Sequence, residues 1–301
     1  MSSITTAIYG GGPFYSGGTS VINDIKGSGF TTVVAWALHV NPSGDLIFND
    51  PTIVSDGAYI GDAGWPELLA SLKQGETSVN RLLFSIGGWE VGDFPNIQSL
   101  IQSQGTGSDS ILYKNFQALK NAIPTIDGID LDDETLYDQN TTVAFSQMLN
   151  TLGYEVTFCP YGNTGFWVDC LYALNSQTPD LVTGFNLQCY AGGGNNTPQP
   201  WIDAIAQKMG SDFPAASFVS PGLWCRHGAS CAEDNCPSDI TSQFAGWKSS
   251  GIQGGFIWLY DDIQKCEGSQ ACGSGVSMNA AAYANAIAQG LQTEAVAVSA
   301  K

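Results

Sequence analysis

Short runs of β-branched and aromatic residues recur along this chain, each followed by a polar, glycine-rich stretch and then by apolar residues at helical spacing. The pattern predicts eight strands, over residues 5–9, 32–37, 81–86, 128–131, 155–159, 181–188, 217–221 and 255–259. Helical periodicity lies between several of these strands, at residues 97–101, 116–120, 143–149 and 201–205, and again at 280–291. Alternating strands and helices favour a parallel sheet, and eight such units close into a (β/α)8 TIM barrel.

An open, doubly wound sheet is the alternative architecture. It would carry a Gly-x-Gly-x-x-Gly turn after the first strand, where this chain has Tyr9-Gly-Gly-Gly-Pro. Pro13 and the missing third glycine argue against a dinucleotide site at this turn. No linker or low-complexity segment interrupts the pattern, so we expect a single α/β domain over residues 1–301.

The composition supports a folded chain with a large core, because 43% of the 301 residues are hydrophobic and only 13% are charged. Ten basic residues against 28 acidic ones give a formal net charge of −18. Such a charge repels phosphate backbones and anionic membranes, so neither nucleic acid nor membrane is expected as a partner. No apolar run reaches the roughly 18 residues that span a bilayer. The surplus of acidic residues favours solubility. It also predicts neutral or cationic substrates and an acidic pH optimum of the activity.

Eight cysteines indicate an oxidising compartment, and all of them lie in the C-terminal half: Cys159, Cys170, Cys189, Cys225, Cys231, Cys236, Cys266 and Cys272. None has the Cys-x-x-Cys spacing of a zinc site, and the only histidines are His39 and His227, so no metal site is expected. Disulfides are the better interpretation, although about 105 pairings are possible for eight cysteines.

Secretion is the expected location, with a cytoplasmic enzyme as the alternative. Two Asn-x-Thr sequons, at Asn140 and Asn195, add weak support because such triplets are common by chance. The first six residues carry neither the basic region nor the apolar core of a signal peptide. We therefore expect either a mature form or export by another route.

The segment from Asp127 to Glu134 is the most informative for chemistry. Side chains alternate along a strand, so Asp130, Asp132 and Glu134 share one face while Ile129 and Leu131 share the other. In a barrel the three acids face the interior. Carboxylates so close together raise the pKa of at least one of them, and such an acid keeps a proton for general acid catalysis. Glu134, nearest the barrel mouth, is the expected proton donor. A calcium loop of the EF-hand type would need a glycine at its sixth position, which this segment lacks.

Four segments carry a resemblance to a known family. Asp127-Gly-Ile-Asp130-Leu-Asp132-Asp-Glu134 resembles the catalytic signature of glycoside hydrolase family 18, the family of chitinases and endo-β-N-acetylglucosaminidases. Three weaker blocks are also similar to the family, and they follow in the expected order: Leu83-Phe-Ser-Ile-Gly87-Gly88-Trp89, Gln188-Cys-Tyr190 and Gly255-Phe-Ile-Trp258.

The resemblance implies a retaining mechanism in which the substrate supplies its own nucleophile and neither a metal nor an organic cofactor takes part. Glu134 would protonate the glycosidic oxygen, and the N-acetyl carbonyl of the substrate would attack the anomeric carbon. Asp132 would hold the acetamide N–H, Tyr190 would bond the acetamide oxygen, and Asp130 would pair with Asp132. The partner implied is a polysaccharide or oligosaccharide that contains N-acetylglucosamine, bound by a monomer.

The other candidate residues follow strand ends, where barrel loops build sites. By resemblance, Trp258 stacks on a sugar, and Gln188 belongs to the same site. Gly87 and Gly88 are expected to let the strand turn and the backbone approach the sugar. Aromatic residues complete the expected set: Trp89, Trp167 and Trp224 are candidates for the cleft, Tyr9 and Tyr161 are weaker ones, and Trp36 and Trp247 are expected to be structural.

Two departures from the family define the subclass. Ala191 stands where the family usually has Asp or Asn after the tyrosine, which questions one polar contact to the scissile sugar. The segment between Trp224 and Gly251 is too short for the α+β insertion of processive enzymes, so the compact class with an open cleft is expected. A chitinase-like endo-hydrolase is the first hypothesis, an endo-β-N-acetylglucosaminidase acting on N-glycans the second, and a non-catalytic lectin or inhibitor the third.

Overall fold

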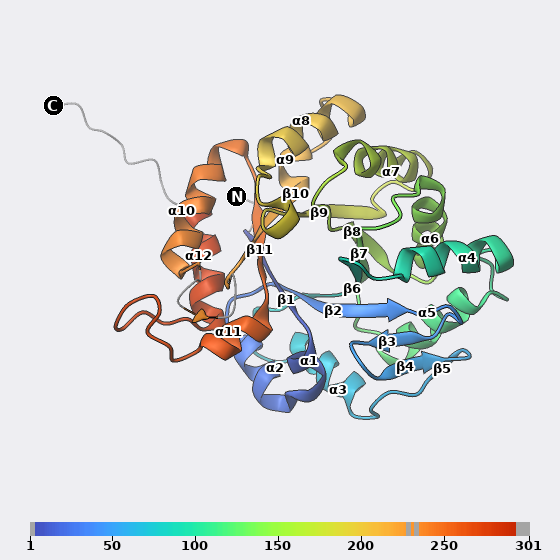
Figure 1. The fold of residues 1–301 in the computed structure, drawn as a ribbon, viewed down its shortest axis with the longest axis horizontal. Coiled ribbons are helices and arrows are strands. Elements are labelled where there is room, and N and C mark those ends of the chain that lie inside the picture. The colour runs from blue at the N-terminus through green and yellow to red at the C-terminus, as the bar shows by residue number, and fades with distance from the viewer. Residues whose placement is uncertain (1–3, 227–229, 232–234, 293–301) are drawn as a thin grey trace.

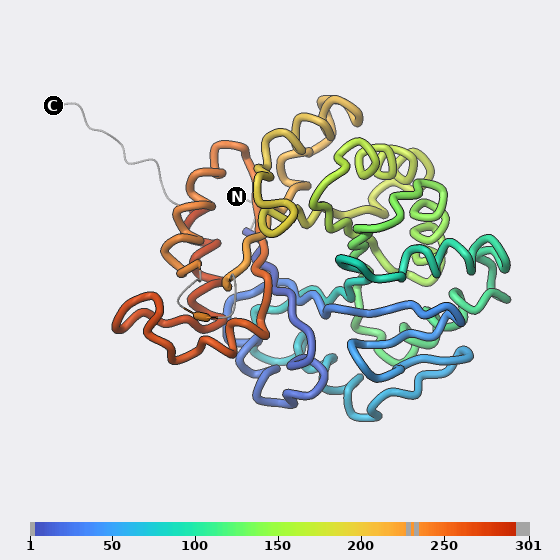
Figure 2. The backbone as a smooth tube through the Cα atoms, in the orientation of Figure 1, coloured from blue at the N-terminus to red at the C-terminus, as the bar shows by residue number. Residues whose placement is uncertain are grey.

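Eight parallel strands close into a barrel surrounded by helices in the computed structural model, which describes residues 4–226, 230–231 and 235–292 (Figure 1). The barrel strands follow one another as β1, β2, β6, β7, β8, β9, β10 and β11, and β1 pairs with both β2 and β11. The closed ring of parallel pairings confirms the TIM barrel and excludes the open sheet. The smooth trace in Figure 2 shows the same single-domain arrangement.

The strands are β1 (Thr5–Gly10), β2 (Thr32–Val40), β3 (Leu46–Phe48), β4 (Thr52–Ser55), β5 (Ala58–Tyr59), β6 (Arg81–Gly88), β7 (Gly128–Asp133), β8 (Glu155–Phe158), β9 (Val182–Gln188), β10 (Val219–Trp224) and β11 (Gly254–Trp258). The helices are α1 (Gly12–Ser16), α2 (Gly18–Gly27), α3 (Trp65–Ala70), α4 (Asp93–Gln104), α5 (Ile111–Ala122), α6 (Gln139–Thr151), α7 (Thr164–Gln177), α8 (Pro198–Met209), α9 (Ala215–Phe218), α10 (Pro237–Trp247), α11 (Tyr260–Cys266) and α12 (Ala280–Gln292).

Each predicted strand corresponds to a barrel strand, with shifted ends. The largest shift of a strand start is at β10, which begins at Val219 rather than at the predicted residue 217, because the residues before it form the short helix α9. The antiparallel strands β3, β4 and β5 were not predicted, since two to four residues are too few to show alternation. The turn between β4 and β5 is Asp56-Gly57, with both φ angles positive (49° and 76°), which is a known hairpin signal.

Alternation along the strands separates two cores. On β7, Ile129 and Leu131 pack outward into the main apolar core between the barrel and the helices. A smaller apolar cluster lies inside the barrel and includes Ala7, Tyr9, Val34, Leu83, Cys159, Tyr190 and Phe256. Asp130 and Asp132 point inward with this second set and are almost fully buried. The barrel interior is therefore a packed core with carboxylates toward its upper end.

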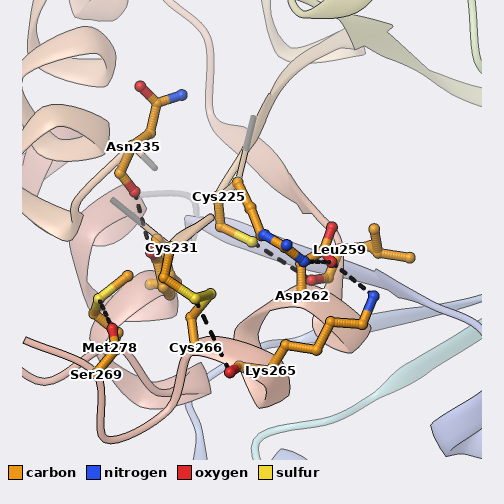
Figure 3. Close-up of a disulfide and its surroundings, with 11 residues drawn as sticks. Cys225, Cys231, Asn235, Leu259, Asp262, Lys265, Cys266, Ser269 and Met278 are labelled. Carbon is orange, nitrogen blue, oxygen red and sulfur yellow. Dashed lines mark hydrogen bonds and ion pairs between the residues drawn. A yellow bond between two sulfur atoms is a disulfide. The ribbon is translucent and has the colours of Figure 1, made fainter. Parts of the chain in front are cut away.

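Two disulfides connect the segments that follow β10 and β11. Cys231 bonds to Cys266 (Figure 3), and Cys236 bonds to Cys272. The prediction of disulfides is thus confirmed for these four cysteines, whereas Cys159, Cys170 and Cys189 are buried free thiols. Burial raises the pKa of Cys189 to about 12, which keeps this thiol protonated.

The segment between β10 and β11 contains α10 and the 3-10 turn η4 (Lys248–Ser250) in its described part, in agreement with the compact class. No described helix is long and apolar enough to cross a membrane. Among the described residues, no group of three or more His, Cys, Asp or Glu side chains could hold a metal ion. His227 lies outside the described residues.

Candidate active site

Asp130 is the centre of a hydrogen-bond network inside the barrel. Its Oδ1 accepts hydrogen bonds from Thr157 on β8 (2.6 Å) and Asn186 on β9 (2.9 Å), and its Oδ2 accepts from Tyr9 on β1 (2.9 Å) and Ser85 on β6 (2.8 Å). Burial raises the pKa of Asp130, and the four donors oppose that rise. Because four other strands hold this carboxyl, it fixes the position of β7 in the barrel.

The two acids beyond Asp130 share one amide donor. Nε2 of Gln188 donates to Oδ1 of Asp132 (2.9 Å), to Oε1 of Glu134 (3.1 Å) and to the carbonyl of Cys159 (3.2 Å). Burial first, and then the charge of Glu134, raises the pKa of Asp132 well above its usual range. Asp132 can therefore hold a proton at a pH where an ordinary carboxyl group is ionised.

The Asp133 carboxylate binds the loop after β7, whereas Asp132 and Glu134 face the cleft. It lies on the opposite face of β7, and its carboxylate accepts hydrogen bonds from the backbone N–H groups of Thr135 (3.0 Å), Leu136 (2.9 Å) and Tyr137 (2.8 Å). These bonds fix the loop that follows the strand. Glu134, at the start of this loop, is thus held at the mouth of the barrel.

A cleft of about 670 Å³ opens above the acids and is lined mainly by aromatic rings and glycines. Its lining residues are Trp36, Gly88, Trp89, Asp132, Glu134, Tyr161, Gln188, Tyr190, Ala191, Gly192, Trp224 and Trp258. The Tyr190 ring stacks with two indoles: its centroid is 5.9 Å from both Trp224 and Trp258, and its plane is inclined by 28° and 26° to theirs. The Trp89 side chain is 73% exposed. Such flat apolar faces beside a few polar groups suit a sugar, whose rings stack on indoles.

Most of the predicted site residues converge on this cleft, and three aromatic or glycine positions have other roles. Tyr9 lies fully buried below the cleft as a donor to Asp130. Gly87 is inside the strand, where a Cβ would come within 2.1 Å of the backbone oxygen of Asp132. Trp167 was a wrong cleft candidate, because it packs against Phe158 in the outer core. The prediction that Asp130 pairs with Asp132 is not supported, since donors from other strands occupy both of its oxygens.

Trp36 is a second wrong prediction, because the structure places it in the cleft rather than in the core. It lies on the inward face of β2, two residues after the interior Val34, and its ring meets Trp258 edge-on at 4.7 Å. The alternation that located the acids also applies here. An inward side chain at the carboxyl end of a barrel strand faces the site.

Sequence reasoning missed Thr157 and Asn186, the two hydrogen-bond donors to Oδ1 of Asp130. The alternation of side chains along a strand, with its period of two residues, could have predicted both. Thr157 precedes Cys159 by two residues on β8, and Asn186 precedes Gln188 by two on β9. Polar side chains at the inward positions of neighbouring strands must meet in the barrel interior, where only another polar group can satisfy them.

The fold belongs to the class of barrels found in chitinases and chitinase-like proteins. The Group IV chitinase of Ostrinia furnacalis, solved in complex with allosamidin, matches with a TM-score of 0.62 over 96% of this chain and 100% of that chain, at 15% identity. The second active domain of a Pyrococcus furiosus chitinase matches with a TM-score of 0.66 over 97% and 96% of the two chains, at 8% identity.

Human YKL-39 is a further structural relative, described as a pseudo-chitinase with retained chitooligosaccharide binding. It has a TM-score of 0.62 over 95% of this chain and 100% of its own, at 11% identity. The sequence itself matches no family model and no curated protein. At these identities the comparisons establish the fold.

Proposed function

We propose that this protein is an endo-acting glycoside hydrolase that cleaves β-1,4 linkages of N-acetylglucosamine polymers with retention of configuration. The observation that carries the proposal is the pair of acids Asp132 and Glu134, which share the Gln188 amide as hydrogen-bond donor below an aromatic cleft. Acids at this spacing resemble the family 18 signature. Chitinases and a chitooligosaccharide-binding protein share the fold, which supports the same class of ligand.

In the first step, Glu134 gives its proton to the glycosidic oxygen and the bond between this oxygen and the anomeric carbon breaks. The acetamido carbonyl oxygen of the same sugar bonds to the anomeric carbon and forms an oxazolinium ion, while the sugar beyond leaves as an alcohol. In the second step, the Glu134 carboxylate takes a proton from water, and the water oxygen attacks the anomeric carbon. The oxazolinium ring opens, and the N-acetyl group is restored.

The neighbours of Glu134 hold the reacting acetamido group. Asp132 accepts the acetamide N–H and stabilises the positive charge that forms in the ring, an interaction that is strongest in a water-poor site. Burial raises the pKa of Tyr190 well above its usual value, so its hydroxyl remains a donor for the acetamide oxygen. Trp258 forms the floor on which the sugar lies. The specificity is accordingly for a 2-acetamido sugar at the cleaved position.

The bridged cysteines indicate the compartment in which we expect this protein to work. Two disulfides favour an oxidising, extracellular environment for this enzyme. Asn140 and Asn195 are both exposed, so either sequon would be accessible for glycosylation there.

The proposal predicts that Glu134→Gln abolishes hydrolysis of chitin oligosaccharides while binding persists. The amide keeps the shape of the side chain but has no acidic proton, and loss of general acid catalysis costs a factor of about 10²–10⁴ or more. Product formation is measured by chromatography and binding by calorimetry. Glu90→Gln is the matched control, because Glu90 is exposed beside Trp89 and is not among the residues that line the cleft. It should hydrolyse at the wild-type rate.

Four outcomes would contradict the proposal, and each points to a different conclusion. Normal turnover by Glu134→Gln would remove this residue from the mechanism, and α-anomeric first products from the wild type would exclude retention. Release of glycan from a high-mannose glycoprotein, with chitin oligosaccharides left intact, would replace the proposal by an endo-β-N-acetylglucosaminidase. Binding without products would make the protein a lectin of the pseudo-chitinase type.

A further inference from the structure

Tyr161 follows β8 and lines the cleft together with Glu134, which follows β7. The two strands are neighbours in the barrel. Nε2 of Gln188 donates to Oε1 of Glu134 (3.1 Å) and to the carbonyl of Cys159 (3.2 Å), two residues before Tyr161. The amide that holds the proton donor therefore also holds the segment that carries this tyrosine.

The loop after β9 fixes both the main chain and the ring of Tyr161. Nδ2 of Asn196 donates to the carbonyl oxygens of Tyr161 (2.8 Å) and Gln188 (2.8 Å), which joins this segment to the end of β9. The ring packs over Gly192, where an added Cβ would come within 3.0 Å of it. Tyr161 is only partly buried, so part of its surface remains accessible to a ligand. A ring that is already held in place loses little conformational entropy on binding.

The place of Tyr161 relative to Trp258 indicates which sugar it meets. In the order of strands around the closed barrel, β11, which ends at Trp258, lies opposite β7. In the proposed mechanism the cleaved sugar lies on Trp258, and Glu134 reaches the oxygen of its glycosidic bond. The sugar that leaves therefore lies toward the β7 side of the cleft, beside the segment after β8.

We propose that Tyr161 is a specificity-determining residue whose ring binds the sugar on the leaving-group side of the scissile bond. The inference rests on the proposed function and assigns a residue to the part of the cleft that holds the leaving sugar. A tyrosine ring offers a rigid apolar surface to the C–H face of a sugar. The contact holds the leaving sugar in place while Glu134 gives its proton to the glycosidic oxygen.

The test compares two substrates that differ beyond the scissile bond. N-acetylglucosamine tetramer has sugars there, whereas the β-fluoride of N-acetylchitobiose loses fluoride alone. Tyr161→Ala should lower kcat/KM for the tetramer about 10-fold or more, the usual effect of truncating an aromatic residue that anchors a ligand. The same variant should leave kcat/KM for the fluoride unchanged. Tyr161→Phe keeps the ring and should cleave the tetramer at close to the wild-type rate.

Tyr172→Ala is the matched control. Tyr172 lies on α7, is 49% exposed and has Nζ of Lys208 5.0 Å from its ring centroid, and it is not among the residues that line the cleft. The control removes the same side chain from another part of the surface and should leave kcat/KM for both substrates unchanged.

The outcomes separate the inference from the proposed function. Wild-type kcat/KM of Tyr161→Ala for the tetramer overturns the inference alone. So does an equal loss on both substrates, which would indicate that Tyr161 acts through the position of the acids. A loss in Tyr161→Phe as large as that in Tyr161→Ala would also overturn it, because the ring would then not be the binding group. If the wild type cleaves neither substrate, the proposed function fails instead.

Discussion

At the scale of the residue, Asp132 shows how a functional group opposes stability. Burial and the neighbouring Glu134 raise its pKa in the folded protein, whereas in the unfolded chain it titrates near about 3.9. The stability that this group contributes is fully present below about pH 3.9 and is lost as the pH rises through the folded pKa. At higher pH the ionised form destabilises the barrel.

Asp132→Asn should therefore raise the Tm at neutral and alkaline pH by a few degrees, since 1 kcal/mol corresponds to about 2–4 °C in a protein of this size class. The gain should shrink toward zero near pH 4, where the wild-type carboxyl is protonated as well. Thermal unfolding between pH 4 and 8 measures the difference. Asp109→Asn, at an exposed position, is the control and should show no such trend. A gain that does not depend on pH would contradict the raised pKa.

At the scale of the element, β6 ends in two glycines because β7 passes so close to it. Gly87 pairs with Asp132 across the parallel ladder, has a φ of +106° and leaves no room for a Cβ, which would clash with the backbone oxygen of Asp132 at 2.1 Å. A side chain at this position would strain β6 and displace the strand that carries the acids.

Gly87→Ala should lower the free energy of unfolding by at least about 2 kcal/mol, from backbone strain together with overpacking. Hydrolysis should decrease as well, because Asp132 moves. Urea unfolding and an activity assay measure both effects. Gly246→Ala in α10 is the control: nothing lies within 4 Å of the added Cβ, and the helix should gain about 0.5–1 kcal/mol. Wild-type stability of Gly87→Ala would show that β6 can move away from β7.

At the scale of the whole molecule, disulfides hold together the two segments that follow the last barrel strands. The bridges join positions 35 and 36 residues apart in the chain. Nearby, Asp262 on α11 pairs with Arg226 (3.1 Å) and with Lys265 (3.0 Å); the dashed line between Asp262 and Lys265 in Figure 3 marks the second pair. Trp224 and Trp258 end the strands that lead into these segments, so the bridges stiffen one wall of the cleft.

Replacing all four bridged cysteines by serine should lower the free energy of unfolding by at least about 2–4 kcal/mol, the usual contribution of a bridge that closes a loop of this length. Urea unfolding without reductant measures the loss. A reductant should lower the unfolding midpoint of the wild type and leave that of the variant unchanged, which distinguishes the bridges from the buried free thiols. A wild-type midpoint unaffected by complete reduction would contradict this contribution.

The sequence by itself determined the barrel and the acids. Strand–helix alternation repeats eight times, and a period of two along β7 places Asp130, Asp132 and Glu134 on one face, so local pattern was sufficient for both. The tertiary structure decided the network around Asp130, the pairing of the cysteines and the place of Trp36. These depend on contacts between residues far apart in the chain, such as Tyr9 with Asp130. The sequence of an apolar strand such as β2 does not show which of its inward side chains face a ligand and which face the core.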